Sequence, residues 1–185
     1  MTHRLKGRRL VVGACLLTFL AAGCTPAEPP APPPSSSVAP TPTENAQERE
    51  ERLAYEAAEK SYREFRAEYY RVLRDGGAKS ATSTMKATAA GPYLKEATEV
   101  VQAYRGLGRR TAGSLKVAEV TRGGYSPDDL VLGACEDTVN VEYFDSKGKI
   151  TGRGEIRVVE LTARPVNGTW KVWSGTGKKV SSCAG

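Results

Sequence analysis

Prolines are concentrated in one short stretch of this chain, and that stretch limits how much of the sequence can fold. Eight of the eleven prolines lie between Pro26 and Pro42. Because proline lacks a backbone N–H and restricts the residue before it, this segment can form neither a helix nor a sheet. We expect an extended tether, with a proline-rich ligand for a peptide-binding module as the alternative. The remaining residues, 44–185, number 142, which suits about one domain with one hydrophobic core.

Residues 1–23 have the composition of an export signal. They hold basic residues and no acidic one, followed by an apolar run at 10–22, which is shorter than the roughly 20 residues of a membrane-spanning helix. Removing this segment leaves 23 basic residues against 21 acidic ones and takes away the only histidine, His3. The folded part therefore lacks the charge excess of a nucleic-acid binder. It also lacks the histidine of a Ser-His-Asp hydrolase or of a histidine metal site.

The export signal ends in Leu20-Ala21-Ala22-Gly23-Cys24. This pattern resembles the lipobox of bacterial lipoproteins, in which small residues admit a peptidase and the cysteine thiol is lipidated; Ala21 stands where leucine is usual. The resemblance implies a signal peptide at 1–23, a lipidated Cys24 with its tether at 24–43, and a domain at 44–185 held on the extracytoplasmic face of the membrane. An ordinary signal peptide followed by an unrelated Cys24 is the alternative.

Apolar residues at helical spacing predict a long first helix over residues 45–75. The stripe consists of Tyr55, Ala58, Tyr62, Phe65, Tyr69 and Val72. Asn45 and Glu48 form a capping-box pattern, and Gly76-Gly77 predicts the end of the helix. We expect the stripe to be core, with a ligand-binding role as the alternative. Two further helices are expected at 78–90 and 92–104.

From residue 114 the apolar period changes to two, which predicts strands. The expected strands are 114–122, 129–144, 151–164 and 169–180. The apolar phase shifts within the second strand, which predicts a β-bulge near Glu136 and Asp137, and a similar shift is expected in the third strand at Val158 and Val159. Asn167-Gly168 predicts a hairpin turn. The expected fold is α+β, with N-terminal helices packed on a curved, cone-like, four-stranded antiparallel sheet.

After export, the two cysteines of the folded part, Cys135 and Cys183, would be in an oxidising compartment. A disulfide between them would close a 48-residue span. A redox or nucleophilic thiol is the alternative, but no histidine remains to activate it. A zinc site would need two further ligands. No metal or cofactor is therefore expected.

The strand region carries several short motifs that resemble a known family. They are Gly133-Ala134-Cys135-Glu136-Asp137, Tyr143-Phe144-Asp145-Ser146-Lys147-Gly148, Gly168-Thr169-Trp170-Lys171-Val172 and the terminal Cys183. Over about residues 45–185 the chain looks like the small secreted or lipid-anchored proteins of actinobacteria whose domain is similar to the nuclear-transport-factor-2-like, or cystatin-like, cone fold. This resemblance implies a Cys135–Cys183 disulfide and a helix-covered curved sheet with a hollow between the two layers.

The cone fold hosts isomerases and cyclases as well as non-enzymes, so the fold alone does not decide the function. An enzyme of this kind needs a base in the hollow with a polar partner beside it. Candidates are Asp137 and Glu136, with Tyr62 or Tyr69 as the proton donor. The alternative roles are a turn-forming carboxylate for Asp137 and core packing for the tyrosines. No spacing in the sequence favours catalysis, so no catalytic residue is assigned.

Contact surfaces are the remaining candidates. Trp170 and Trp173 lie on opposite faces of one strand, and Trp173 is the one expected to be exposed. Basic residues close in the sequence offer contacts for anions: Arg105, Arg109, Arg110, Lys116, Lys171, Lys178 and Lys179. We expect a non-catalytic binding or assembly module, anchored to the membrane by lipid and meeting an envelope protein or an anionic wall polymer, but no nucleic acid. A small apolar ligand carrier or a cone-fold enzyme using the hollow is the alternative.

Overall fold

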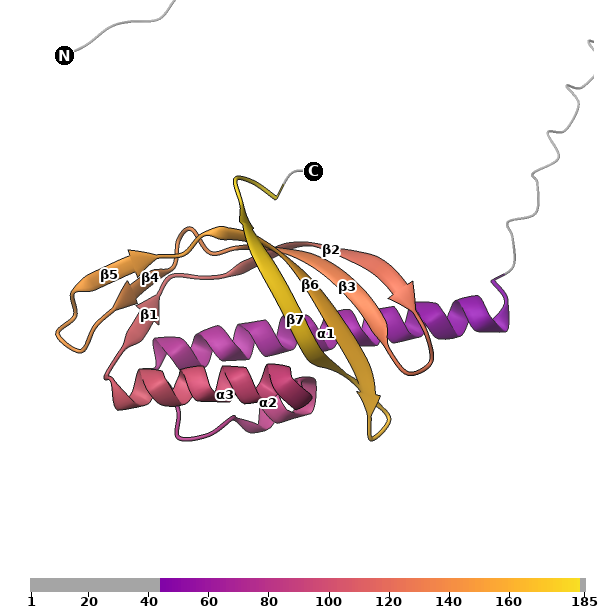
Figure 1. Ribbon diagram of the computed structural model, residues 1–185, viewed down its shortest axis with the longest axis horizontal. Helices are drawn as coiled ribbons and strands as arrows, with labels where there is room; N and C mark the ends of the chain where they lie inside the picture. Colours follow the sequence, from indigo (N-terminus) through magenta and orange to yellow (C-terminus); the bar gives the residue numbers. More distant parts are fainter. Residues whose placement is uncertain (1–43, 184–185) are drawn as a thin grey trace, which may run out of the picture. The chain divides into compact units, whose positions relative to one another are not determined.

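The computed structural model describes residues 44–183, in which three helices lie on one side of two antiparallel sheets (Figure 1). The helices are α1 (Ala46–Arg74), α2 (Ser83–Thr88) and α3 (Gly91–Gly106). One sheet has the order β1-β4-β5, with β1 (Arg110–Ala112), β4 (Glu142–Phe144) and β5 (Ile150–Arg153). The other has the order β2-β3-β6-β7, with β2 (Lys116–Tyr125), β3 (Leu130–Asp137), β6 (Ile156–Val166) and β7 (Thr169–Val180). The expected α+β class is confirmed, and the three-stranded sheet is an addition to it.

The signal segment, Cys24 and the tether, all predicted within residues 1–43, lie outside the described residues. Within the described part of the chain, no helix combines the length and the apolar character needed to cross a bilayer.

Helix α1 begins and ends where its capping signals are. Asn45 Oδ1 accepts a hydrogen bond from the Glu48 backbone N–H at 2.9 Å, and Glu48 Oε2 accepts one from the Asn45 N–H at 2.8 Å. This reciprocal pair satisfies two N–H groups that have no partner within the helix. At the other end Gly76 and Gly77 adopt φ of 85° and 84°, a conformation that favours glycine, and the chain leaves the helix there.

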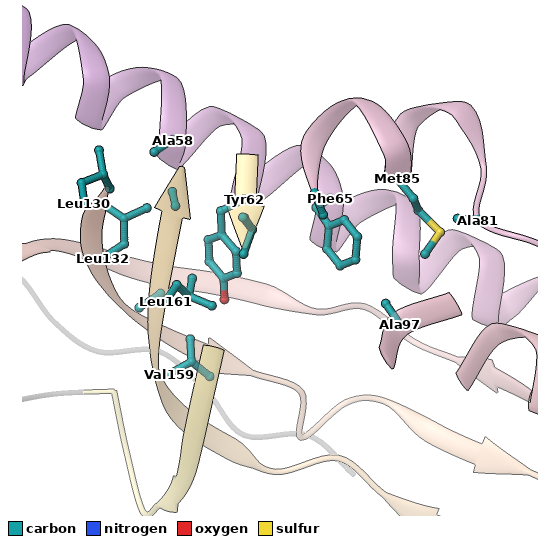
Figure 2. Close-up of a cluster of buried hydrophobic side chains, with 14 of the residues drawn as sticks. Ala58, Tyr62, Phe65, Ala81, Met85, Ala97, Leu130, Leu132, Val159 and Leu161 are labelled. Atoms are coloured by element: carbon teal, nitrogen blue, oxygen red, sulfur yellow. The ribbon is translucent and has the colours of Figure 1, made fainter. Parts of the chain in front are cut away.

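The core lies between α1 and the inner face of the four-stranded sheet. The predicted stripe of α1 forms one side of it: Tyr55, Ala58, Tyr62, Phe65 and Val72 are buried, and Tyr69 is half-buried. Figure 2 shows Leu130, Leu132, Val159 and Leu161 of the strands on the side facing α1, with Met85 of α2 beside Phe65. Full burial of such a side chain contributes about 1.5–3 kcal/mol, so this face of α1 holds the helix to the sheet.

The second helix is shorter than expected. Residues 78–90 are predicted as helical, but α2 covers only Ser83–Thr88. The Thr82 hydroxyl accepts a hydrogen bond from the Met85 N–H at 3.2 Å and caps the helix, which therefore begins at Ser83 rather than at residue 78. Side chains of serine and threonine compete for backbone hydrogen bonds, which explains the irregular lead-in. The third helix is confirmed, with Ala97 and Val101 buried against the core.

The two sheets are formed by three long strands that all break at the same level. Residues 113–115 separate β1 from β2, residues 138–141 separate β3 from β4, and residues 154–155 separate β5 from β6. A register irregularity does lie at the predicted level, but on the neighbouring strand: β2 shifts between Val117 and Glu119, which pair with Glu136 and Cys135. Within β3 itself no bulge occurs, because β3 pairs with β6 without a shift as far as Asp137↔Ile156. The apolar phase change marks the passage from one sheet to the next.

The shift expected in the third strand is also absent at Val158 and Val159. Both residues keep register with β3; Val158 simply lies on the exposed outer face. The irregularity of β6 comes later, between Thr162 and Ala163, where its pairing with β7 shifts. The predicted hairpin turn is confirmed, with φ of 54° at Asn167 and 75° at Gly168.

Close backbone contact stabilises the break between the sheets. An added Cβ at Gly113 would lie 1.9 Å from the Asn140 carbonyl oxygen, and one at Gly154 would lie 2.0 Å from the Thr138 carbonyl oxygen. Thr138 also bridges the gap, since its hydroxyl donates to the Glu155 carbonyl at 2.6 Å. These contacts leave no space for a side chain where the strands change sheets.

Gly113→Ala should therefore lower the free energy of unfolding by more than about 2 kcal/mol, since the φ of 88° and the backbone contact both oppose a Cβ. Chemical denaturation monitored by circular dichroism measures the change. Gly124→Ala is the matched control, because nothing lies within 4 Å of its added Cβ. Equal stabilities of the two variants would contradict this account of the junction.

The outer edge of the four-stranded sheet is protected by α1. β2 has a single strand neighbour, and unpaired strand edges invite association with other chains. The Tyr55 hydroxyl donates to the Gly123 carbonyl at 2.7 Å, and Arg63 donates to the Val117 carbonyl at 2.9 Å. Side chains of α1 thus occupy carbonyls that another strand would otherwise use.

A disulfide joins Cys135 of β3 to Cys183, with the two Cα atoms 5.6 Å apart. The predicted pairing is confirmed. The bond holds residues 181–183 against the outer face of the sheet, opposite the helices. Closing a span of 48 residues corresponds to about 4 kcal/mol of stabilisation in the loop-entropy treatment.

Replacing both cysteines by alanine should lower the free energy of unfolding by about 4 kcal/mol, because the unfolded chain regains the closed loop's freedom. Denaturation with and without a thiol reductant measures it. The reductant should destabilise the wild type and leave the double variant unchanged. A reductant effect of equal size on both proteins would contradict the prediction.

Candidate functional site

A buried ionic network lies in the hollow between α1 and β3. Tyr62 and Arg66 are four residues apart on α1 and so share one helix face. The Tyr62 hydroxyl donates to Glu136 Oε1, and an Arg66 guanidinium N–H donates to Glu136 Oε2 at 2.7 Å. Tyr62 is 0 % exposed and Glu136 is 4 % exposed. Figure 2 shows the Tyr62 hydroxyl directed away from α1 toward the strands.

The network fixes the charge of its members. Burial alone would lower the pKa of Arg66, but the Glu136 carboxylate raises it, and the net pKa is raised. Burial also raises the pKa of Tyr62, and the adjacent carboxylate raises it further. Arg66 therefore stays a cation and Tyr62 stays a neutral donor, with the two oxygens of Glu136 engaged by them. Such an arrangement fixes the position of the carboxylate and balances its charge with that of Arg66.

Aromatic rings surround the Arg66 guanidinium. Its central carbon lies 5.3 Å from the centroid of Tyr69 and 5.1 Å from that of Tyr70, within the range of cation–π attraction. The Tyr69 ring also stacks on Phe65 at 5.9 Å. Tyr69 thus contacts Arg66 and the core, and it does not hydrogen-bond to Glu136. Of the two tyrosines predicted as donors, the structure brings Tyr62 to the carboxylate.

An open cleft of about 260 Å³ lies beside the network. Arg66 and Glu136 form its inner end, and Tyr93, Glu96 and Arg157 line its sides. Gly175 and Gly177 of β7 also border it. The lining carries two cations and two carboxylates, which suits a polar rather than an apolar occupant. Among residues 44–183 there is no cluster of three or more Asp, Glu, His or Cys side chains suited to a metal ion.

Asp137 lies outside the hollow. Neighbouring strand residues point to opposite faces, so Asp137 shares the outer face with Cys135 while Glu136 points inward. Asp137 Oδ1 accepts a hydrogen bond from the Val139 N–H at 3.0 Å and shapes the turn after β3. Of the two acidic candidates, only Glu136 points toward α1 and contacts Tyr62. The even-numbered apolar residues Leu130, Leu132 and Ala134 carried that signal in the sequence.

Arg66 is the member of the network that sequence reasoning missed. Its side chain is 13 % exposed although arginine is usually a surface residue. The signal was its spacing of four from Tyr62 and its position inside the aromatic stripe. The partner Glu136 comes from a strand far along the chain, which no local pattern reveals.

Trp173 is the extra residue of a bulge in β7, because Thr162 pairs with Ser174 and Ala163 pairs with Val172. It is half-buried rather than exposed: an added Cβ at Gly91 would lie 2.7 Å from its ring. The Arg164 guanidinium lies 5.2 Å from the centroid of the Trp173 ring. Trp170 packs against the core, as the strand alternation predicts.

Arg66 and Glu136 depend on each other for stability. Arg66→Met should cost about 3–5 kcal/mol of unfolding free energy, because it leaves the Glu136 carboxylate buried without its cation. Arg52→Met is the matched control on the same helix; Arg52 pairs with Glu44 and Glu56 in solvent, so its replacement should cost much less unfolding free energy. Urea denaturation of both variants measures the difference. Similar losses in both would mean that the buried pair has no special role.

Comparisons with known proteins identify the fold. No protein-family model matches this chain, and no curated protein matches it. The crystal structure of the intermembrane space region of the chloroplast protein ARC6 is similar at a TM-score of 0.51 and 10% identity, over 68% of this chain and 96% of that one.

Two other solved structures match at lower TM-scores. One is a nuclear-transport-factor-2-like family protein from Streptomyces avermitilis, with a TM-score of 0.45 and 12% identity over 71% of this chain and 99% of that one. The other is a nuclear-transport-factor-2-like protein with a cystatin-like fold from Novosphingobium aromaticivorans, with a TM-score of 0.42 and 15% identity over 77% of this chain and 94% of that one. The fold of residues 44–183 is α+β, with helices on curved antiparallel sheets, and it is similar to that of the ARC6 region.

Proposed function

We propose that this protein is a lipid-anchored extracytoplasmic lipoprotein of the actinobacterial type, whose cone domain is a non-catalytic binding or assembly module at the cell envelope. The proposal that the domain is non-catalytic rests on the hydrogen bonds of the Glu136 side chain. Its two carboxylate oxygens accept hydrogen bonds from Tyr62 and Arg66 inside the hollow. Each carboxylate oxygen is already engaged by a donor of the same domain, which supports a structural role for Glu136 over that of a general base.

The core argues against the alternative of an apolar ligand carrier. Such a carrier needs an apolar cavity that encloses most of its ligand. Here Tyr62, Phe65, Leu132 and Leu161 fill the space between α1 and the sheet. The neighbouring cleft is open and bordered by charged side chains. Because side chains fill the space between α1 and the sheet, the domain would contact a partner through its outer surface.

The location rests on the sequence of the N-terminus and is compatible with the disulfide. The basic and apolar segment followed by Ala22-Gly23-Cys24 favours lipidation of Cys24 after export. The Cys135–Cys183 bond agrees with an oxidising compartment. The proline-rich segment would then hold the domain away from the membrane.

Cys24→Ala should release the protein from the membrane fraction, because the thiol that would carry the lipid is lost. Fractionation of cells followed by immunoblotting measures the distribution. Cys15→Ala is the matched control, since Cys15 lies inside the expected signal segment and should leave the protein on the membrane. An unchanged distribution of the Cys24 variant would contradict the anchor.

A further inference from the structure

A second groove, distinct from the hollow, runs between α1 and the chain that leads into β2. Its volume is about 320 Å³. On the α1 side it is lined by Arg63, Arg66, Ala67, Tyr70 and Arg74, and on the other side by Ser114, Leu115 and Val117. The lining thus contains three arginines and no acidic residue.

Two of the arginines, Arg63 and Arg74, lie at the two ends of the groove. Arg63 donates to the Val117 carbonyl at 2.9 Å, and Arg74 lies 3.5 Å from the Gly113 carbonyl, at the limit of a hydrogen bond. Eleven residues of helix separate the two, which is about 16 Å along the axis. The small side chain of Ala67 lies between them in the sequence and keeps the middle of the groove open.

The arginines retain capacity to bind an anion. Within residues 44–183 Arg74 makes no ion pair with a carboxylate. Arg63 pairs with Glu59 through Nε, in solvent, and has further N–H groups. Nε of Arg66 is buried and has no hydrogen-bond partner in the described part of the chain, although its charge is balanced by Glu136. The groove therefore combines net positive charge with an unsatisfied donor beside it.

We propose that this groove binds a phosphate ester anion, carried either by a membrane phospholipid or by a soluble phosphorylated molecule. Guanidinium groups offer paired N–H donors that match phosphate oxygens, and no carboxylate in the lining repels the anion. The volume equals that of about ten water molecules, which accommodates a phosphate together with part of its alcohol. The inference names the ligand class of the binding module proposed above and rests on that function.

The test uses the full-length lipoprotein in neutral detergent micelles. Glycerol 3-phosphate is titrated as the soluble probe, and phosphatidylglycerol is added to the micelles as the lipid probe, with phosphatidylcholine as the uncharged reference. Isothermal titration calorimetry measures both affinities. We expect at least one anionic probe to bind, and to bind more weakly as salt is raised. Binding of the soluble probe assigns a free phosphate ester, and binding of the lipid probe alone assigns a headgroup.

Ala67→Glu places a carboxylate in the groove without removing an arginine, and Ala67 is an exposed helix position. It should weaken binding of the anionic probe by about tenfold or more through repulsion. Ala103→Glu is the matched control, since Ala103 is an exposed position of α3. Arg74→Gln should weaken binding similarly, with Lys147→Gln in the β4–β5 turn as its control. Circular dichroism confirms that each variant is folded.

Three results would overturn the inference: no binding of either anionic probe, equal binding by Ala67→Glu and the wild type, or tighter binding of a glutamate-rich peptide than of both phosphates. The last would assign an acidic protein partner. The inference and the proposed function fail separately. Because binding of a headgroup could also hold the protein on membranes, the anchor is tested with Cys24→Ala and Ala67→Glu combined: membrane retention of that double variant would refute the anchor alone. An anchored protein without phosphate binding would refute the groove alone.

Discussion

The buried carboxylate of Glu136 is the interaction on which the arrangement of helix and sheet depends. A carboxylate that is 4 % exposed must be neutralised, and both groups that engage it, Tyr62 and Arg66, come from one turn of α1. Buried ion pairs add little net stability, but breaking one is costly. The network therefore fixes one turn of α1 relative to Glu136 of β3. Burial of the apolar stripe stabilises the packing of the helix on the sheet.

The same network occupies the space between α1 and β3 where a candidate active site was expected. Both oxygens of its inward carboxylate accept a hydrogen bond from α1, and the rings of Tyr69 and Tyr70 lie within cation–π range of the arginine that neutralises it. Chemistry at this position would first have to break a buried ion pair. The candidate contact surfaces are the polar cleft beside β7 and the arginine-lined groove along α1, and most of the residues that line them lie outside the network. Arg66 borders both, so the structural network and the candidate binding surfaces share one side chain.

Local patterns in the sequence predict the elements well, and long-range pairing explains what they miss. The capping pair at Asn45 and Glu48 and the aromatic stripe predict α1 because both act within one helix. The apolar phase change within residues 129–144 fits both a bulge in that strand and a break between two sheets; the structure has the break after Asp137 and places the register shift in the neighbouring strand β2. Only the partner strands, with Gly113 and Gly154 at the same level, distinguish them. Local patterns do not predict the role of Arg66 either, because its partner Glu136 lies 70 residues away along the chain.

The central claim is that Tyr62, Arg66 and Glu136 act as structure rather than as a reactive site. The most direct measurement is the unfolding free energy of the triple variant Tyr62→Phe, Arg66→Met, Glu136→Leu, together with the proteins crosslinked to it in intact envelopes. Replacing a whole buried ionic network by apolar side chains of similar volume is often neutral or stabilising. We therefore predict a stability equal to or above that of the wild type and an unchanged set of crosslinked partners. A folded triple variant that loses those partners would contradict the account.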